Sequence, residues 1–292
     1  MPRDALSGGP RPLTVSLTIR LLSCEFTVVT DCPTLERRLD GLVPHVTQRF
    51  PISRRHRLEA RRTADGGYHL HEEGREPTRE PDASAAARTL FWRMHELVLR
   101  AFPDSTVIHA GCATRGSRRF LAAGAANSGK STLMTRLLYE GFRVHCDDLV
   151  LLHRGESVPY PRRFFIRPES VSLIPQLAAH AVDPFEWGGW EPGSLALDPS
   201  RLGFEWGIER APVDAVFFLE REREAQAEAR IEACPKYAMA ARLMSQSCKP
   251  ASGPRDWIRD ICRTVDRADC FVLRSGELEA SVSAIRSILD DR

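Results

Sequence analysis

The sequence predicts an α/β protein in which one main domain with a central sheet follows a small α+β module. Two observations support this prediction. A buried strand, a glycine-containing loop and a helix follow one another within residues 119–141. Before and after this stretch, short apolar runs that suit strands are separated by amphipathic helical patterns. The length of 292 residues exceeds one average domain and fits a main core with a smaller appendage.

The first part of the chain predicts a small module with strands and one helix. Residues 1–12 are rich in Gly and Pro and are expected to be a disordered tail. The module covers residues 13–80, and its boundary falls in the polar, proline-containing stretch 73–86. An arginine-rich run within it suggests a phosphate or RNA patch, but Leu58 and Glu59 interrupt it, which favours a solvated face. The expected elements are two strands in 13–30, a helix in 33–46 and a strand in 67–72.

Residues 87–292 are expected to form the main domain. The apolar positions of 87–102 recur at helical spacing, so we predict an amphipathic helix that packs on the sheet that follows. Residues 106–113 and 119–123 then predict a hairpin, which delivers the chain to the glycine-containing loop in an antiparallel pair.

The loop after this hairpin has the spacing of a phosphate-binding P-loop, GxxxxGK[ST]. In such a loop, backbone N–H groups surround a triphosphate and the following helix directs its positive end toward it. Lys130 would reach the β- and γ-phosphates and Ser131 would offer its hydroxyl to Mg²⁺. The chain has 38 Arg and only three Lys, so a lysine at this position favours a specific role for its ammonium group. The predicted nucleotide-binding residues are Gly124, Ala125, Ala126, Asn127, Ser128, Gly129, Lys130, Ser131 and Thr132.

Two adjacent carboxylates, Asp147 and Asp148, follow the next predicted strand, 142–146. Neighbouring carboxylates repel each other unless a cation or a shared proton offsets the charge. One would therefore bind Mg²⁺, and the other would act as a general base toward a hydroxyl that attacks the γ-phosphate. This interpretation places their strand beside the P-loop strand, and the alternative is an ordinary polar turn between two strands.

The remaining sequence is less regular. Arg162, Arg163 and Arg167 are candidates for contacting phosphate charge, or else surface arginines. Residues 183–207 contain three tryptophans without periodicity, which suits either a functional lid or an oligomer contact. The remaining expected elements are a strand at 164–167, a helix at 170–181, strands at 213–219 and 229–234, a helix at 237–245, and a strand at 270–273 between helices at 255–267 and 277–289.

Composition excludes several classes of function. The 41 basic and 39 acidic residues leave a net charge of +2 that is spread along the chain, so neither a nucleic acid nor a membrane is expected as a partner. The sequence has no long apolar run and no signal-peptide pattern, which favours a cytoplasmic protein. The eight cysteines form no CxxC pair and suit reduced, packed thiols. His69 and His71 share a strand face, but two histidines alone are weak evidence for a metal.

The segment IHAGCATRGSRRFLAAGAANSGKSTLMTRLLYEGFRVHCDDLVLL resembles the core of HPr kinase/phosphorylase and of the HPr-kinase-related proteins. In that family a strand-end histidine, a hairpin, the P-loop and an Asp pair follow at the spacing found here. The resemblance implies a twisted mixed sheet like that of HPr kinase and phosphoenolpyruvate carboxykinase. It also implies that Asp147 is the base, that Asp148 and Ser131 lie at the metal, that Lys130 clamps phosphate, and that His109 lies near the base.

The function expected from these residues is that of an ATP- and Mg²⁺-dependent kinase. It would transfer the γ-phosphate to a hydroxyl, foremost that of serine, on a protein or peptide. Two alternatives stay open: a nucleotide-dependent binding module without phosphotransfer, and a small-molecule kinase on the same fold. The identity of the acceptor and the formation of a homo-oligomer are not fixed by the sequence.

Overall fold

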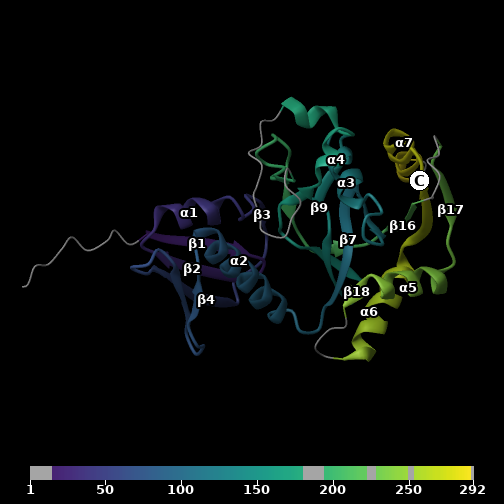
Figure 1. The fold of residues 1–292 in the computed structure, drawn as a ribbon. Coiled ribbons are helices and arrows are strands. Elements are labelled where there is room, and N and C mark those ends of the chain that lie inside the picture. Colours follow the sequence, from purple (N-terminus) through teal and green to yellow (C-terminus); the bar gives the residue numbers. More distant parts are fainter. Residues whose placement is uncertain (1–14, 180–193, 222–227, 249–252, 291–292) are drawn as a thin grey trace, which may run out of the picture. The chain divides into compact units, whose positions relative to one another are not determined.

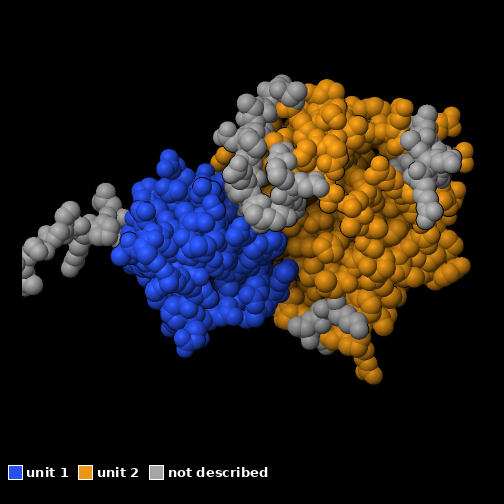
Figure 2. All heavy atoms as spheres, viewed as in Figure 1, with its two compact units in different colours: residues 1–43, 52–101 blue, residues 44–51, 102–292 orange. Residues whose placement is uncertain are grey.

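The computed structural model describes residues 15–179, 194–221, 228–248 and 253–290. These form two compact units, shown in different colours in Figure 2. Unit 1 contains residues up to 43 together with 52–101, and unit 2 contains 44–51 together with 102–292. The expected tail at 1–12 lies outside the described residues. None of the helices in the described part of the chain has the length and apolar character needed to span a bilayer.

Unit 1 is a five-stranded sheet with two helices (Figure 1). Strands β1 and β2 form a hairpin in which each residue from Val15 to Leu21 pairs in order with one from Thr30 to Cys24. Apolar residues alternate with polar ones along these strands, so one sheet face is buried and the other is polar. The strand order is β1-β2-β4-β5-β6. The elements are β1 (Val15–Leu21), β2 (Cys24–Thr30), α1 (Pro33–Asp40), β4 (Arg54–Arg62), β5 (Tyr68–Glu72), β6 (Thr78–Glu80) and α2 (Ala83–Arg100).

Helix α2 forms as the sequence predicts, but the prediction that it packs on the sheet that follows is wrong. Asp82 caps the helix by accepting hydrogen bonds from the backbone N–H groups of Ser84 and Ala85. Its buried side packs on α1 and on strands β2, β5 and β6 of unit 1. An apolar stripe requires a partner surface but does not specify which one. The main unit therefore begins at residue 102 rather than 87, and it also takes in residues 44–51.

Unit 2 is built on a ten-stranded mixed sheet. Its path is β15-β11-β10-β7-β8-β16-β19-β17, and β9 and β18 also pair with β7. Its strands are β7 (Thr106–Arg115), β8 (Arg118–Gly124), β9 (Arg143–Cys146), β10 (Leu149–His153), β11 (Glu156–Pro159), β15 (Ala211–Pro212), β16 (Ala215–Arg221), β17 (Arg230–Ala233), β18 (Ser247–Cys248) and β19 (Asp269–Ser275). Two short pairs lie beside it, namely β12 (Phe164–Ile166) with β13 (Leu195–Leu197), and β3 (Thr47–Gln48) with β14 (Gly207–Ile208).

Two hydrophobic cores cover the two faces of this sheet. Along β8, Phe120 and Ala122 belong to the core that includes α3 and α7, while Leu121 and Ala123 belong to the core that includes α5 and α6. This alternation explains why the central strands read as continuous apolar runs. The helices are α3 (Lys130–Leu138), α5 (Lys236–Ser245), α6 (Pro254–Arg267) and α7 (Leu278–Asp290), with the short α4 (Pro168–Val171) and the 3₁₀ helix η1 (Pro175–Ala179).

Two other sequence expectations about unit 2 need correction. The helix predicted over 170–181 is replaced by α4 and η1, because Pro175 interrupts the pattern, and its last two residues lie outside the described part. Trp206 is buried, donates its Nε1–H to the backbone oxygen of His145 at 2.8 Å, and packs edge-on against Phe164. It is therefore a core residue, whereas Trp187 and Trp190 lie outside the described residues.

Candidate active site

The loop from Gly124 to Gly129 joins β8 to α3 in a backbone path that needs its glycines. Asn127 and Gly129 have left-handed φ values of 65° and 90°. A Cβ added to Gly124 would lie 2.8 Å from the backbone oxygen of Leu219 and 2.7 Å from Ser128 Oγ. The loop is thus drawn tightly against β16, and a larger residue at position 124 would force it away.

Lys130, the first residue of α3, folds back over this loop. Its Nζ donates hydrogen bonds to the backbone oxygens of Gly124 and Ala125, at 2.7 and 2.9 Å. Burial lowers the pKa of Lys130, and the charges of Asp148 and Asp147 oppose that shift. Ser128 Oγ is buried and has no hydrogen-bond partner among the described residues. An anion entering the loop would therefore find a nearby ammonium and an unused hydroxyl donor.

Asp147 and Asp148 connect β9 to β10, and both of these strands pair with β7. Both strands run antiparallel to β7, with Cys146 opposite Cys112 and Leu149 opposite His109. The prediction that their strand lies beside the loop strand β8 is wrong, because β7 separates them. Strand β7 pairs with one side of β8 in antiparallel orientation, and β16 pairs with the other side in parallel. The two carboxylates nevertheless line the same pocket as the loop.

Asp147 is almost fully buried, and one of its carboxyl oxygens is unsatisfied. Its Oδ2 has no hydrogen-bond partner in the described structure. Burial raises the pKa of Asp147 to about 7, with the Asp148 charge adding to the shift and the Arg162 charge and a hydrogen bond with Ser131 opposing it. A carboxyl group in this state can accept a proton near neutral pH.

Asp148 is more exposed and lies beside Arg162 and His109. Its Oδ2 accepts a hydrogen bond from Arg162 Nη2 at 2.5 Å, and its Oδ1 lies 3.7 Å from His109 Nδ1. Burial opposes ionisation of Asp148, but His109 and Arg162 outweigh it and hold its pKa below the usual range. His109 is half exposed and lies beside Asp148 rather than beside the buried Asp147.

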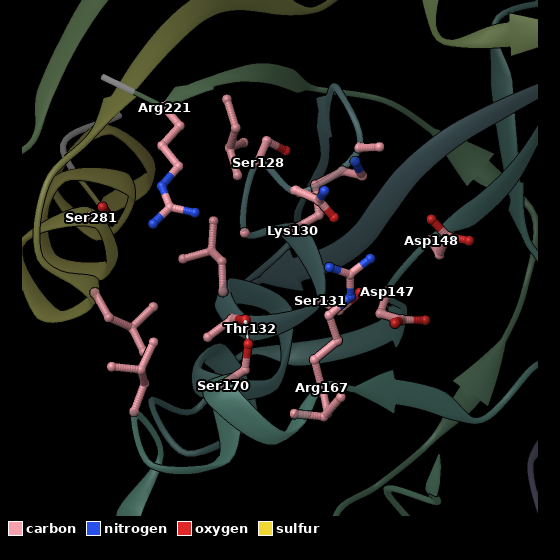
Figure 3. A pocket seen from close by; sticks show the side chains of 18 of the residues that line it. Ser128, Lys130, Ser131, Thr132, Asp147, Asp148, Arg167, Ser170, Arg221 and Ser281 are labelled. Carbon is pink, nitrogen blue, oxygen red and sulfur yellow. Dashed lines mark hydrogen bonds between the residues drawn. The ribbon is translucent and has the colours of Figure 1, made fainter. Parts of the chain in front are cut away.

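A cavity of about 590 Å³ brings these groups together (Figure 3). Strands β8, β16 and β19 are parallel, and their carboxyl ends meet at this cavity, where Gly124, Leu219 and Leu273 stand side by side in register. Open α/β sheets commonly bind ligands outside the carboxyl ends of their strands. In Figure 3, Asp147 and Asp148 lie on one side of Lys130, and Arg221 and Ser281 lie on the other.

Of the three candidate arginines, Arg162 and Arg167 line the cavity. Arg163 is instead buried near Asp198, with its Nε 3.9 Å from the Asp198 carboxylate. Sequence analysis missed Arg221, which also lines the cavity from the end of β16. The apolar run before Arg221 predicted the strand, but its parallel pairing beside β8 was not visible in the sequence.

The described residues contain no group of three or more His, Cys, Asp or Glu side chains able to hold a metal by themselves. Mg²⁺ usually takes one or two carboxylates and completes its shell with water and substrate phosphates. Ser131, Asp147 and Asp148 supply oxygen donors of that kind at the cavity. Ser131 forms its side-chain hydrogen bond with Asp147, so the structure associates Ser131 with Asp147 rather than with Asp148.

Other candidate residues from the sequence lie elsewhere. The rings of His69 and His71 are 6.2 Å apart on β5 of unit 1 and join no metal-binding group among the described residues. All eight cysteines are free thiols, as expected from the sequence.

No protein-family model and no curated protein matches this sequence. Among solved structures, the chain is similar to the Hpr(Ser) kinase/phosphatase from Coxiella burnetii, with a TM-score of 0.30 and 14% sequence identity. The match covers 64% of this chain and 99% of that chain. A TM-score this low supports no conclusion about fold or function.

Proposed function

We propose that this protein is an ATP- and Mg²⁺-dependent kinase that transfers the γ-phosphate to a hydroxyl, foremost that of serine, of a protein or peptide. The observation that carries the proposal is the meeting of two features in one cavity. The Gly124–Thr132 segment, with Lys130 and an unused Ser128 hydroxyl, suits a polyphosphate. Opposite it, Asp147 combines burial, an unpartnered oxygen and a raised pKa.

The two ends of the cavity suggest how the donor would lie. Phosphates on the loop would direct the γ-phosphate toward Asp147 and Asp148. The nucleoside would then extend past Lys130 toward the apolar Leu219, Leu273 and Leu278, on the side where Arg221 and Ser281 also line the cavity. A guanidinium such as that of Arg221 can stack on a purine ring or pair with a phosphate.

Asp147 would act as the general base. It accepts the proton of the attacking hydroxyl while the oxygen of that hydroxyl forms a bond to the γ-phosphorus and the bond to the β–γ bridging oxygen breaks, which releases ADP. Lys130 and Arg162 would stabilise the charge that develops on the phosphoryl oxygens. Asp148 and Ser131 would hold Mg²⁺, which would offset the negative charge of the phosphate oxygens. His109 would orient Asp148.

This assignment agrees with the motif spacing that resembles the HPr-kinase-related proteins, and we include a relation to that family and its sheet architecture in the proposal. The test is transfer of label from γ-labelled ATP with Mg²⁺ to proteins in a lysate or to peptides encoded by neighbouring genes. Asp147→Asn should reduce transfer by about 10²- to 10⁴-fold while ATP still binds. Lys130→Ala should weaken both ATP binding and transfer.

Two outcomes would contradict the proposal. Full transfer by Asp147→Asn would refute the general-base role. Tight ATP binding without transfer to any acceptor would instead favour a nucleotide-dependent binding module. A titration of Mg²⁺ into the ATP complex distinguishes the roles of the two carboxylates. Asp148→Asn should weaken Mg²⁺ binding more than Asp147→Asn does. The opposite order would assign the metal to Asp147 and Ser131.

A further inference from the structure

The polar face of the unit 1 sheet carries a concentrated positive charge that the proposed phosphotransfer does not use. Side chains alternate along β4, so Leu58 and Ala60 are buried while the arginines at positions 55, 57 and 61 point to the opposite, polar face. The pairing register adds arginines from β1 and β6 to the same face. The five arginines are Arg20, Arg55, Arg57, Arg61 and Arg79, which we call the arginine face.

Two glutamates of the arginine face each pair with two of its arginines. Glu25 is shared by Arg20 and Arg55, at 3.0 and 3.1 Å, and Glu59 is shared by Arg57 and Arg61, at 2.8 and 3.3 Å. Arg79 pairs with Asp65 from the neighbouring turn. Glu25 and Glu59 are thus each divided between two guanidinium groups. The arginine side chains are 41% to 75% exposed.

We infer that the arginine face binds an extended acidic segment of a polypeptide. Alternate side chains of an extended peptide project to the same side about every 7 Å, which is also the spacing of Arg55 and Arg57 along β4. Carboxylates at alternate positions of a partner could therefore meet successive guanidinium groups, which bind carboxylates in a bidentate manner. The incoming carboxylates would compete with Glu25 and Glu59 for these guanidinium groups.

A peptide suits this face better than a single-stranded nucleic acid. Sheets that bind single-stranded RNA stack its bases on exposed aromatic side chains. Among the described residues, the polar face offers no Phe, Tyr or Trp; its remaining positions are mainly Ser, Thr, Val and His. Binding of the acidic segment does not depend on ATP or on the phosphotransfer proposed above.

The test is fluorescence anisotropy without nucleotide, using a labelled peptide of about ten alternating Glu and Thr residues, which spans about 33 Å when extended. A peptide with Gln in place of Glu and an oligouridine of similar length serve as competing probes. We expect binding of the Glu peptide alone, with affinity that falls as salt is raised from about 50 to about 300 mM.

Strand β4 offers a matched control. Arg55→Gln with Arg57→Gln should weaken binding about tenfold. Arg54→Gln with Arg62→Gln removes the same charge from the same strand but from the other face, where both residues are also exposed, and should change affinity less than twofold. Glu25→Gln with Glu59→Gln should tighten binding several-fold because it frees the arginines, and this variant keeps the test informative if an arginine variant fails to fold. Equal losses in both arginine pairs, preference for oligouridine, or no binding of the Glu peptide would each overturn the inference.

Discussion

His145 should make unit 2 lose stability as the pH falls below the ordinary pKa of a histidine side chain. It is 1% exposed and lies on β9, two residues before Asp147. Its Nδ1 lies 2.7 Å from the backbone oxygen of Gly207, which can only accept, so Nδ1 carries the proton. Nε2 then accepts a hydrogen bond from Thr114 Oγ1 at 2.8 Å. Both ring nitrogens are satisfied in the neutral form, and a second proton would place a charge in this buried site and require the Thr114 hydroxyl to accept instead of donate.

The size of the effect follows from the pKa. Burial lowers the pKa of His145 from 6.5 to about 4, and the charge of Arg119 adds to the shift. Well above pH 6.5 the His145 side chain is neutral in both the folded and the unfolded protein, and no stability is lost. As the pH falls through this value, the unfolded chain gains a proton that the folded chain does not. The loss is about 2 kcal/mol near pH 5 and levels off at about 3 kcal/mol below pH 4.

Native-state hydrogen exchange measures this directly. Peptides covering β7 and β9 report the opening free energy of unit 2 after correction for the intrinsic exchange rate at each pH. The comparison is between wild type and His145→Gln, whose amide can donate to Gly207 and accept from Thr114 without titrating. The wild type should lose about 2 kcal/mol more than the variant between pH 7.5 and pH 5. An equal loss in both proteins would refute the reasoning.

Three substitutions test other parts of unit 2. A Cβ at Gly111 would lie 2.5 Å from Met134 Cγ, so Gly111→Ala should lower the thermal unfolding midpoint, with a cost of about 1–3 kcal/mol. The same substitution should cost less in a Met134→Ala background, where the clash is absent, and an equal cost in both backgrounds would contradict this packing. Gly124→Ala should weaken ATP binding at least about tenfold in a titration by displacing the loop, whereas unchanged affinity would show that the loop tolerates a side chain. The buried carboxylate of Asp198 accepts hydrogen bonds from both the backbone N–H and the ring of His45. Asp198→Asn should therefore destabilise the protein by about 2 kcal/mol in urea unfolding and expose residues 44–51 to proteolysis. Unchanged cleavage would argue against this anchoring role.

The local parts of the site were predictable from the sequence because their signals are local. The hairpin of β7 and β8, the glycine loop and helix α3 follow one another within about 30 residues, and each has its own pattern of glycines or periodicity. The structure also brings Lys130, Ser131, Asp147 and Asp148 to one cavity, as expected. Their catalytic and metal-binding roles remain predictions.

What the sequence did not reveal depends on pairings between distant residues. Strand β7 lies between β8 and β9, the strand that precedes Asp147. This strand order is not encoded by any short sequence pattern. Arg221 reaches the cavity because β16 pairs in parallel with β8, almost one hundred residues earlier. Short strands such as β14 and β15 have two residues each, too few to show any alternation.

The pairing of Thr47 with Gly207 has a practical consequence for dissecting this protein. Residues 44–51 belong to unit 2 although both flanking segments belong to unit 1, so the polypeptide passes between the units three times. A polypeptide starting at Phe102 would therefore lack strand β3 and the His45 bonds to Asp198, and would not contain the whole of unit 2. Residues 44–51 of unit 2 interrupt unit 1, so the separate study of unit 1 calls for joining residues 43 and 52 rather than for a single cut.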